Sequence, residues 1–116
     1  LNILQASLVA MRRALANLKL DLSNSAILVD GKFLIPQLVC KEQRAVVKGD
    51  SLIHSIAAAS IVAKVHRDAI MDDLSKQFPQ YEFAKHKGYG TRAHIQSIKK
   101  YGLSPVHRVR FCGKIV

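Results

Sequence analysis

The chain has 116 residues, enough for one compact domain and too few for two of ordinary size. Hydrophobic residues make up 49% and charged residues 22%, a globular composition that excludes an intrinsically disordered chain. Eighteen Lys and Arg against eight Asp and Glu give a net charge of +10. No apolar run approaches the roughly 20 residues that cross a bilayer, so we expect no membrane partner. The two cysteines stand far apart without metal-ligand spacing, which favours a reducing, cytoplasmic setting.

The excess positive charge is concentrated toward the end of the chain. Residues 1–82 carry ten basic and eight acidic side chains, whereas residues 83–116 carry eight basic side chains and no acidic one. Folding gives no reason for such self-repulsion, so the asymmetry predicts a polyanionic partner such as nucleic acid. A basic segment that only increases solubility is the alternative.

The first half of the chain predicts one helix and several short strands. Apolar side chains at helical spacing over residues 4–18 predict an amphipathic helix. Residues 26–29 are an apolar run that ends at Asp30 and is typical of a buried strand. After a tight turn, residues 33–35 are expected to pair with it as a return strand. Residues 45–47 form a further short apolar run, which predicts another strand.

The second half is predominantly helical. A long helical pattern runs over residues 51–78 and is expected to end at Pro79. Residues 80–90 predict a loop, and Thr91 is a suitable N-cap for a last helix over residues 92–101. Helices that alternate with short strands predict the α/β class, in a single domain that covers residues 1–116. Two or three strands make a thin sheet, which would be explained by a missing partner segment.

Two aspartates follow short apolar runs. Asp30 stands at the carboxyl end of its strand, where ligand sites form in α/β folds. Asp50 follows Gly49 directly before the long helix. Each has an alternative role: Asp30 can cap the turn at Gly31, and Asp50 can cap the helix. Local sequence leaves both alternatives open.

Two carboxylates at neighbouring strand ends are unexpected in a chain with a net charge of +10. Metal-assisted phosphoryl transfer is the chemistry that joins carboxylates to polyanions, because acidic oxygens hold Mg²⁺ or Mn²⁺ beside a phosphate. The basic surface would bring in the nucleic acid, and the acidic pair would carry the reaction. We therefore expect Asp30 and Asp50 to act as metal-site carboxylates.

Residues 85–91 (KHKGYGT) form the segment most typical of a binding loop. Lys85, His86 and Lys87 can contact phosphates, as can the nearby Arg92. Tyr89 lies between two glycines, which suits an exposed ring that stacks on a sugar or base. The alternative is a solvated loop with Tyr89 packed over the core.

The remaining histidines have no carboxylate or cysteine at ligand spacing. His54, His66 and His94 are therefore interpreted as surface or hydrogen-bonded core residues. For His107 a phosphate contact and a structural turn are equally open. Charged residues 64 and 68 stand four apart on one helix, which predicts an ion pair.

Short segments, in order over almost the whole chain, resemble those of bacterial ribonuclease HII. They are residues 1–4 (LNIL), 10–13 (AMRR), 28–31 (LVDG), 46–50 (VVKGD), 56–65 (IAAASIVAKV), 67–68 (RD), 83–89 (FAKHKGY) and 104–108 (SPVHR). The resemblance implies an RNase H-like fold, a mixed sheet flanked by helices. It also implies a monomeric, metal-dependent endoribonuclease that uses Mn²⁺ or Mg²⁺. Its expected substrates are RNA–DNA hybrids and duplex DNA with embedded ribonucleotides, cut 5′ of the ribonucleotide to leave 3′-hydroxyl and 5′-phosphate ends.

The resemblance also assigns residues to roles. Asp30 would be a metal-site carboxylate, and Asp50 would be the last acidic residue of that site. Tyr89 would pack against the deoxyribose next to the ribonucleotide, with Lys87 and Gly88 beside the same strand.

The chain departs from the family in one respect. An Asp-Glu pair and a glycine–arginine–glycine loop are expected before the segment that matches residues 1–4, and no such run occurs here. We therefore expect the C-terminal portion of the enzyme, inactive alone because half of its metal ligands are missing. The competing class is a non-catalytic basic nucleic-acid-binding module in which both aspartates are caps. A weaker third interpretation is a structural protein of a ribonucleoprotein.

Overall fold

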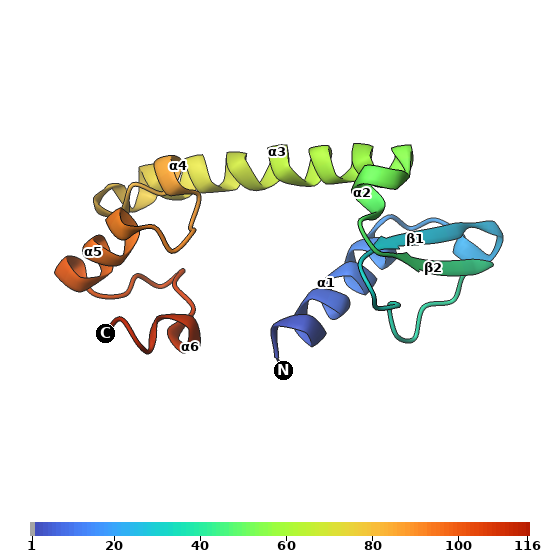
Figure 1. Ribbon diagram of the computed structural model, residues 1–116, viewed down its shortest axis with the longest axis horizontal. Coiled ribbons are helices and arrows are strands. Elements are labelled where there is room, and N and C mark those ends of the chain that lie inside the picture. The colour runs from blue at the N-terminus through green and yellow to red at the C-terminus, as the bar shows by residue number, and fades with distance from the viewer. Residues whose placement is uncertain (1) are drawn as a thin grey trace. The chain divides into compact units, whose positions relative to one another are not determined.

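The computed structural model describes residues 2–116 (Figure 1). The chain divides into two compact units, Leu1–Ile61 and Val62–Val116, and the division falls within helix α3 (His54–Gln77). The expectation of one domain stays a prediction. None of the helices within residues 2–116 has the length and apolar character needed to span a membrane.

The first unit opens with the predicted amphipathic helix, α1 (Ile3–Asn17). Its N-cap is Asn2, whose side-chain oxygen accepts the backbone N–H of Gln5 at 2.9 Å. A short 3-10 helix, η1 (Leu22–Asn24), follows and is capped in the same way by Asp21. The helical pattern over residues 4–18 is thereby confirmed.

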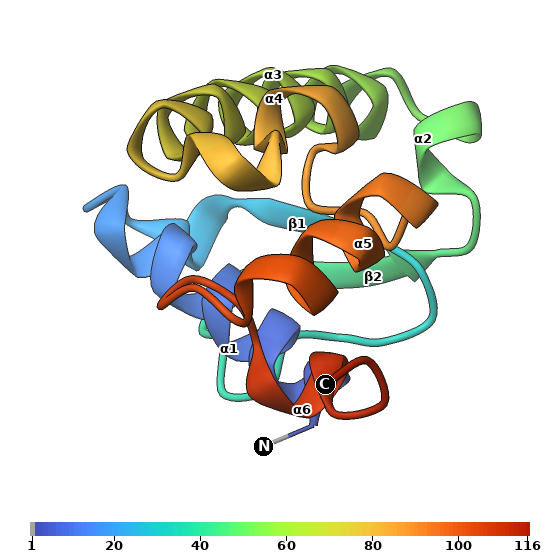
Figure 2. The same ribbon diagram turned by 90° about the vertical axis from the view of Figure 1, so that its left-hand side faces the viewer.

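The sheet has two strands, β1 (Ala26–Asp30) and β2 (Glu42–Val46), which lie side by side in Figures 1 and 2. They pair in parallel, with Asp30 opposite Val46 in the register. Both strands therefore end at the same edge of the sheet. Helices and a parallel strand pair confirm the predicted α/β class.

The return strand predicted over residues 33–35 is wrong. These residues form an irregular segment, and β1 pairs instead with β2, which follows later in the chain. The backbone of Ile35 bonds to a side chain rather than to a strand: its N–H donates to Gln43 Oε1 at 2.6 Å and its carbonyl accepts Gln43 Nε2 at 3.1 Å. These two hydrogen bonds satisfy the backbone N–H and carbonyl of a buried residue, as pairing with a neighbouring strand would otherwise do.

The helix predicted over residues 51–78 is divided in two. A short helix, α2 (Gly49–Leu52), is separated from α3 (His54–Gln77) by Ile53, whose φ of -128° and ψ of 121° are extended. Gly49 is buried where α2 begins, and a Cβ there would lie 2.7 Å from Ile56 Cδ1. The close packing of this glycine fixes the path of the chain from β2 into α2.

The second unit consists of the later part of α3 and the short helices that follow it in the chain. Its core contains Met71, Tyr81 and Phe83, with Leu74 and Phe78 packed against them. The remaining elements are η2 (Pro79–Tyr81), α4 (Phe83–His86), α5 (Arg92–Tyr101) and α6 (Val109–Cys112).

The last predicted helix is confirmed at both ends. Thr91 Oγ1 accepts the backbone N–H of His94 at 3.3 Å, and Gly102 ends α5 at a φ of 78°. The predicted loop over residues 80–90 also contains α4. This single helical turn lies between Glu82 and Lys87, both left-handed with φ of 55° and 53°.

Candidate functional site

The carboxylate of Asp30 lies at the edge where both strands end. Its Oδ1 accepts the backbone N–H of Gly49 at 3.0 Å, and Gly31 N–H donates to Val46 O at 2.9 Å. The chain leaving β2 is thus held against the end of β1. This contact with Gly49, rather than a turn bond over Gly31, is the one that Asp30 makes among the described residues.

Asp50 follows Gly49 directly and stands in the first turn of α2. It lies in a helix rather than at a strand end, because the chain turns through the left-handed Lys48 (φ 55°) before α2 begins. The N-cap position is Lys48, so within the described residues the Asp50 side chain does not cap this helix. Asp30 and Asp50 are both exposed to solvent, and the carboxylate of Asp30 is bonded to the residue that precedes Asp50.

Asp30 and Asp50 have the type of ligand atom that a divalent cation prefers, but they are fewer than the ligands that a complete site needs. Carboxylate oxygens are the donors that Mg²⁺ and Mn²⁺ prefer. Across residues 2–116, no group of three or more His, Cys, Asp and Glu is placed to hold a metal ion. Asp30 and Asp50 can therefore supply part of a coordination shell, and further ligands must come from water, substrate or other protein groups.

The second unit holds the predicted binding loop. Lys87 and Gly88 both have positive φ, 53° and 81°, and a Cβ on Gly88 would lie 3.0 Å from Met71 Cε. The tight turn directs Tyr89 outward, with 66% of the residue exposed. Its ring lies 5.2 Å from the guanidinium carbon of Arg67, a cation–π distance. Tyr89 is thus presented on the surface, and the alternative in which it packs over the core is not observed.

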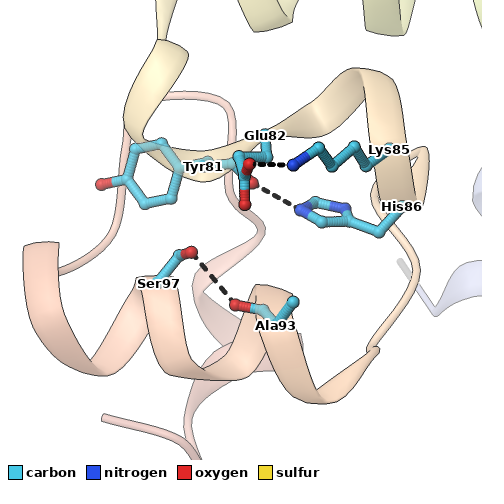
Figure 3. A network of polar contacts seen from close by, with 6 residues as sticks. All are labelled: Tyr81, Glu82, Lys85, His86, Ala93 and Ser97. Carbon is cyan, nitrogen blue, oxygen red and sulfur yellow. Dashed lines mark hydrogen bonds and ion pairs between the residues drawn. The ribbon is translucent and has the colours of Figure 1, made fainter.

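The two loop lysines already have carboxylate partners. Lys85 Nζ lies 2.5 Å from Glu82 Oε1 (Figure 3), and Lys87 Nζ lies 2.8 Å from Asp72 Oδ1. The bond from Lys85 lowers the pKa of the Glu82 carboxyl. Exposed pairs of this kind are weak, on the order of 1 kcal/mol or less, so a phosphate can compete for either ammonium. Arg92 is exposed in the first turn of α5.

The structure shows which histidines lie on the surface and which are hydrogen-bonded in the interior. His94 is buried at 6% exposure and hydrogen-bonded, whereas His54 and His66 are exposed. His86 is buried at 7% exposure and bonded to the backbone, so it is not presented to phosphates as the sequence predicted. His107 has a structural role, because its ring bonds to Ser104 and to His94.

Sequence reasoning missed Arg67 as a neighbour of Tyr89. It sits on α3, 22 residues before the tyrosine, and no spacing rule connects the two. The ion pair predicted between Lys64 and Asp68 is not among those formed by the described residues.

The predicted site residues divide between the two units. Asp30 and Asp50 belong to the first unit. The nucleic-acid-contacting candidates belong to the second and are Lys85, Lys87, Gly88, Tyr89 and Arg92.

The chain matches the family profile described as ribonuclease HII over residues 1–114. It is 50% identical over 111 residues to a ribonuclease HII from Borreliella burgdorferi, covering 96% of this chain and 60% of the relative. A ribonuclease HII from Trichodesmium erythraeum is 54% identical over 111 residues, or 96% of this chain and 51% of the relative. One from Fusobacterium nucleatum is 52% identical over 120 residues, covering 100% of this chain and 55% of that relative. The chain therefore spans somewhat more than half the length of these curated relatives, and it belongs to the ribonuclease HII family.

Proposed function

We propose that this chain contributes to a metal-dependent endoribonuclease that acts on RNA–DNA hybrids and on duplex DNA with embedded ribonucleotides. Cleavage would occur 5′ of the ribonucleotide and leave 3′-hydroxyl and 5′-phosphate ends. Membership of the ribonuclease HII family supports the reaction class. The single observation that carries the assignment is the Asp30 carboxylate, held at the sheet edge by the N–H of Gly49 beside Asp50.

Asp30 and Asp50 are the proposed metal-site carboxylates. When bound, Mg²⁺ or Mn²⁺ would neutralise charge on the scissile phosphate and lower the pKa of a water ligand. Asp30 contributes a fixed oxygen, because its bond to Gly49 restricts the carboxylate, while its other oxygen makes no hydrogen bond within residues 2–116 and would face the cation. Asp50 contributes a second carboxylate from the adjoining turn.

The second unit is proposed to hold the nucleic acid. Its eleven Lys and Arg side chains against four carboxylates give a net charge of +7, which attracts a phosphate backbone. Tyr89 would pack on the deoxyribose beside the ribonucleotide, with Lys87 and Gly88 next to the same strand. Lys85 and Arg92 would contact phosphates.

The 116-residue chain is proposed to be inactive alone, as the C-terminal part of a single catalytic domain. Two carboxylates would bind a divalent ion weakly, and residues 2–116 place no third His, Cys, Asp or Glu with them as a metal site. The working enzyme is proposed to be monomeric and cytoplasmic.

A chimaera tests the proposal. This chain would replace the matching segment of the Trichodesmium erythraeum relative, and cleavage of a duplex with one ribonucleotide would be measured with and without Mn²⁺. We expect cleavage that requires metal and is lost in Asp30→Asn, with duplex affinity retained. Asparagine keeps the oxygen that accepts from Gly49, so the variant removes charge rather than the fold contact. Unchanged cleavage by Asp30→Asn would refute the assignment.

A non-catalytic nucleic-acid-binding module is the second candidate. It is favoured by the separation of the basic charge into a unit that lacks both Asp30 and Asp50. A chimaera that binds the duplex normally but does not cut it, with or without metal, would support this candidate.

A further inference from the structure

Two histidine side chains in the second unit, His107 and His94, form a hydrogen-bonded chain that ends on the backbone carbonyl of Tyr89, and a third, His86, stacks on it. Ser104 N–H donates to His107 Nδ1 at 3.0 Å, and the Nε2 atoms of His107 and His94 lie 2.9 Å apart. His94 Nδ1 lies 2.9 Å from the carbonyl oxygen of Tyr89. His86 stacks on His94, with ring centroids 4.0 Å apart and an interplanar angle of 11°.

The partners of this chain fix the position of every imidazole proton. A backbone N–H can only donate, so His107 Nδ1 is an acceptor and its proton is on Nε2; the Ser104 hydroxyl, 2.7 Å from the same Nδ1, then acts as a second donor to it. A carbonyl can only accept, so His94 carries its proton on Nδ1 and presents a bare Nε2 to His107. The two assignments are compatible only when both rings are neutral.

His86 is fixed in the same way. Gly88 N–H donates to His86 Nδ1 at 3.1 Å, and His86 Nε2 lies 2.5 Å from the carbonyl oxygen of Tyr81 (Figure 3). His86 is therefore neutral, with its proton on Nε2. His86 and His94 thus hold the backbone at Gly88 and at Tyr89, on both sides of the exposed ring.

A second proton on any of these rings places two donors face to face. It would oppose Gly88 N–H at His86, Ser104 N–H at His107, and the Nε2–H of His107 at His94. Burial lowers the pKa of His86 and of His107, which acts in the same direction. The titratable or charged residues that lie near the cluster include Arg67 on α3, Tyr81 and Glu82 at η2, Tyr101 on α5, and Arg108 and Cys112 at α6.

We propose that neutral His86, His94 and His107 are positioning residues that hold the Lys87–Gly90 turn in the conformation that presents Tyr89 to nucleic acid. The role of the histidines in holding the turn follows from their hydrogen bonds alone. Their effect on nucleic-acid binding rests on the proposed function of Tyr89. Protonation of the cluster would release the turn and weaken binding. That direction is opposite to the general electrostatic effect, in which added positive charge strengthens binding to a polyanion.

The imidazole protonation states provide a test that does not depend on activity. Long-range proton–nitrogen NMR spectra of the 116-residue chain at pH 7.5 distinguish the two neutral tautomers and the charged form. We expect Nε2–H for His86 and His107 and Nδ1–H for His94, and we expect the Gly88 amide to be protected from exchange. A charged ring, a different tautomer or an unprotected Gly88 amide would overturn the proposal.

Binding of the chain to a labelled RNA–DNA hybrid provides the second test. We expect His94→Leu to weaken binding about tenfold, as Tyr89→Ala does, because stacking on one base or sugar has about that magnitude. The double variant should be no weaker than Tyr89→Ala alone. His94→Asn keeps a donor where Nδ1–H stands and should restore most of the affinity, and the exposed His66→Leu is the matched control. Additive losses in the double variant would overturn the proposal.

The pH profile separates this proposal from the proposed function. Between pH 7.5 and 5.5 we expect the affinity of the unaltered chain to fall and that of Tyr89→Ala to stay level or rise. If Tyr89→Ala binds as tightly as the unaltered chain at pH 7.5, the assigned role of Tyr89 fails, and the NMR result alone decides whether the histidines hold the turn. If Tyr89→Ala weakens binding but both proteins respond equally to pH, the positioning role fails and the proposed function stands.

Discussion

The carboxylate of Asp30 accepts a hydrogen bond from the backbone N–H of Gly49 at 3.0 Å, across 19 residues of sequence. This bond links the end of β1 to the start of α2 and places the Asp30 side chain against the residue that precedes Asp50. Gly49 is also closely packed on its other side: a Cβ there would lie in ordinary contact with Asp30 Oδ1, at 3.6 Å, but only 2.7 Å from Ile56 Cδ1. Gly49 therefore both donates the hydrogen bond that positions Asp30 and packs tightly against Ile56.

Gly49→Ala should destabilise the first unit. The added methyl would stand 2.7 Å from Ile56 Cδ1 and 3.3 Å from Val46 Cβ, so neighbouring side chains must move. Overpacking of this kind costs about 1–3 kcal/mol in the free energy of unfolding, which urea denaturation would measure. Gly90→Ala is the matched control, since its Cβ meets nothing within 4 Å and its φ is not positive. Equal stability of the two variants would contradict the packing argument.

The stability of the second unit should depend on pH near neutrality. Burial lowers the pKa of His86 and His107 in the folded chain, so above about 6.5, the usual value for histidine, both states bind few protons and stability is highest. As pH falls below about 6.5 the unfolded chain takes up protons that the folded chain resists, and stability is lost. Amide exchange in α5 (Arg92–Tyr101), measured at pH 7.5 and 5.5 and corrected for intrinsic rates, should show less protection at the lower pH. Protection that is equal or greater at pH 5.5 would contradict this account.

The loop cations should set part of the salt dependence of binding. The logarithm of the affinity for a hybrid duplex falls linearly with the logarithm of the salt concentration, and the slope becomes shallower by about 0.9 for each phosphate contact removed. Replacing Lys85, Lys87 and Arg92 by Met, singly and together, should reduce the slope stepwise. Lys19→Met, a substitution in the first unit, is the control and should leave the slope unchanged. A triple variant with the original slope would show that these side chains do not contact phosphates.

Structure that depends on neighbours in the sequence was predicted well. The helix α5 begins at Arg92 and ends at Tyr101 as expected, because Thr91 and Gly102 act within one turn of its ends. The return strand over residues 33–35 failed because Ile35 bonds to the side chain of Gln43, eight residues away, and β1 pairs with a later strand. No proline or glycine marks the break at Ile53, so the division between α2 and α3 had no sequence signal.

The residues of the candidate site could be predicted where their signal comes from neighbours in the sequence. Asp30 and Asp50 could be singled out because each follows a short apolar run, and Tyr89 because glycines flank it. The contacts that support them are distant in sequence. Arg67 reaches Tyr89 from α3, and His107 bonds to His94 over 13 residues, so neither contact leaves a periodic pattern. Such contacts depend on the tertiary fold and become visible only in it.

Manganese broadening of amide NMR signals tests the central claim, that Asp30 and Asp50 share a divalent cation, most directly. Titration of Mn²⁺ into the 116-residue chain should broaden the amides of residues 30, 49 and 50 together, at concentrations typical of a weak, incomplete site. Asp30→Asn and Asp50→Asn should each abolish the broadening, and Asp72→Asn, on the exposed face of α3, should not. Broadening centred on Asp72 and Asp73, or unaffected by Asp30→Asn, would contradict the assignment.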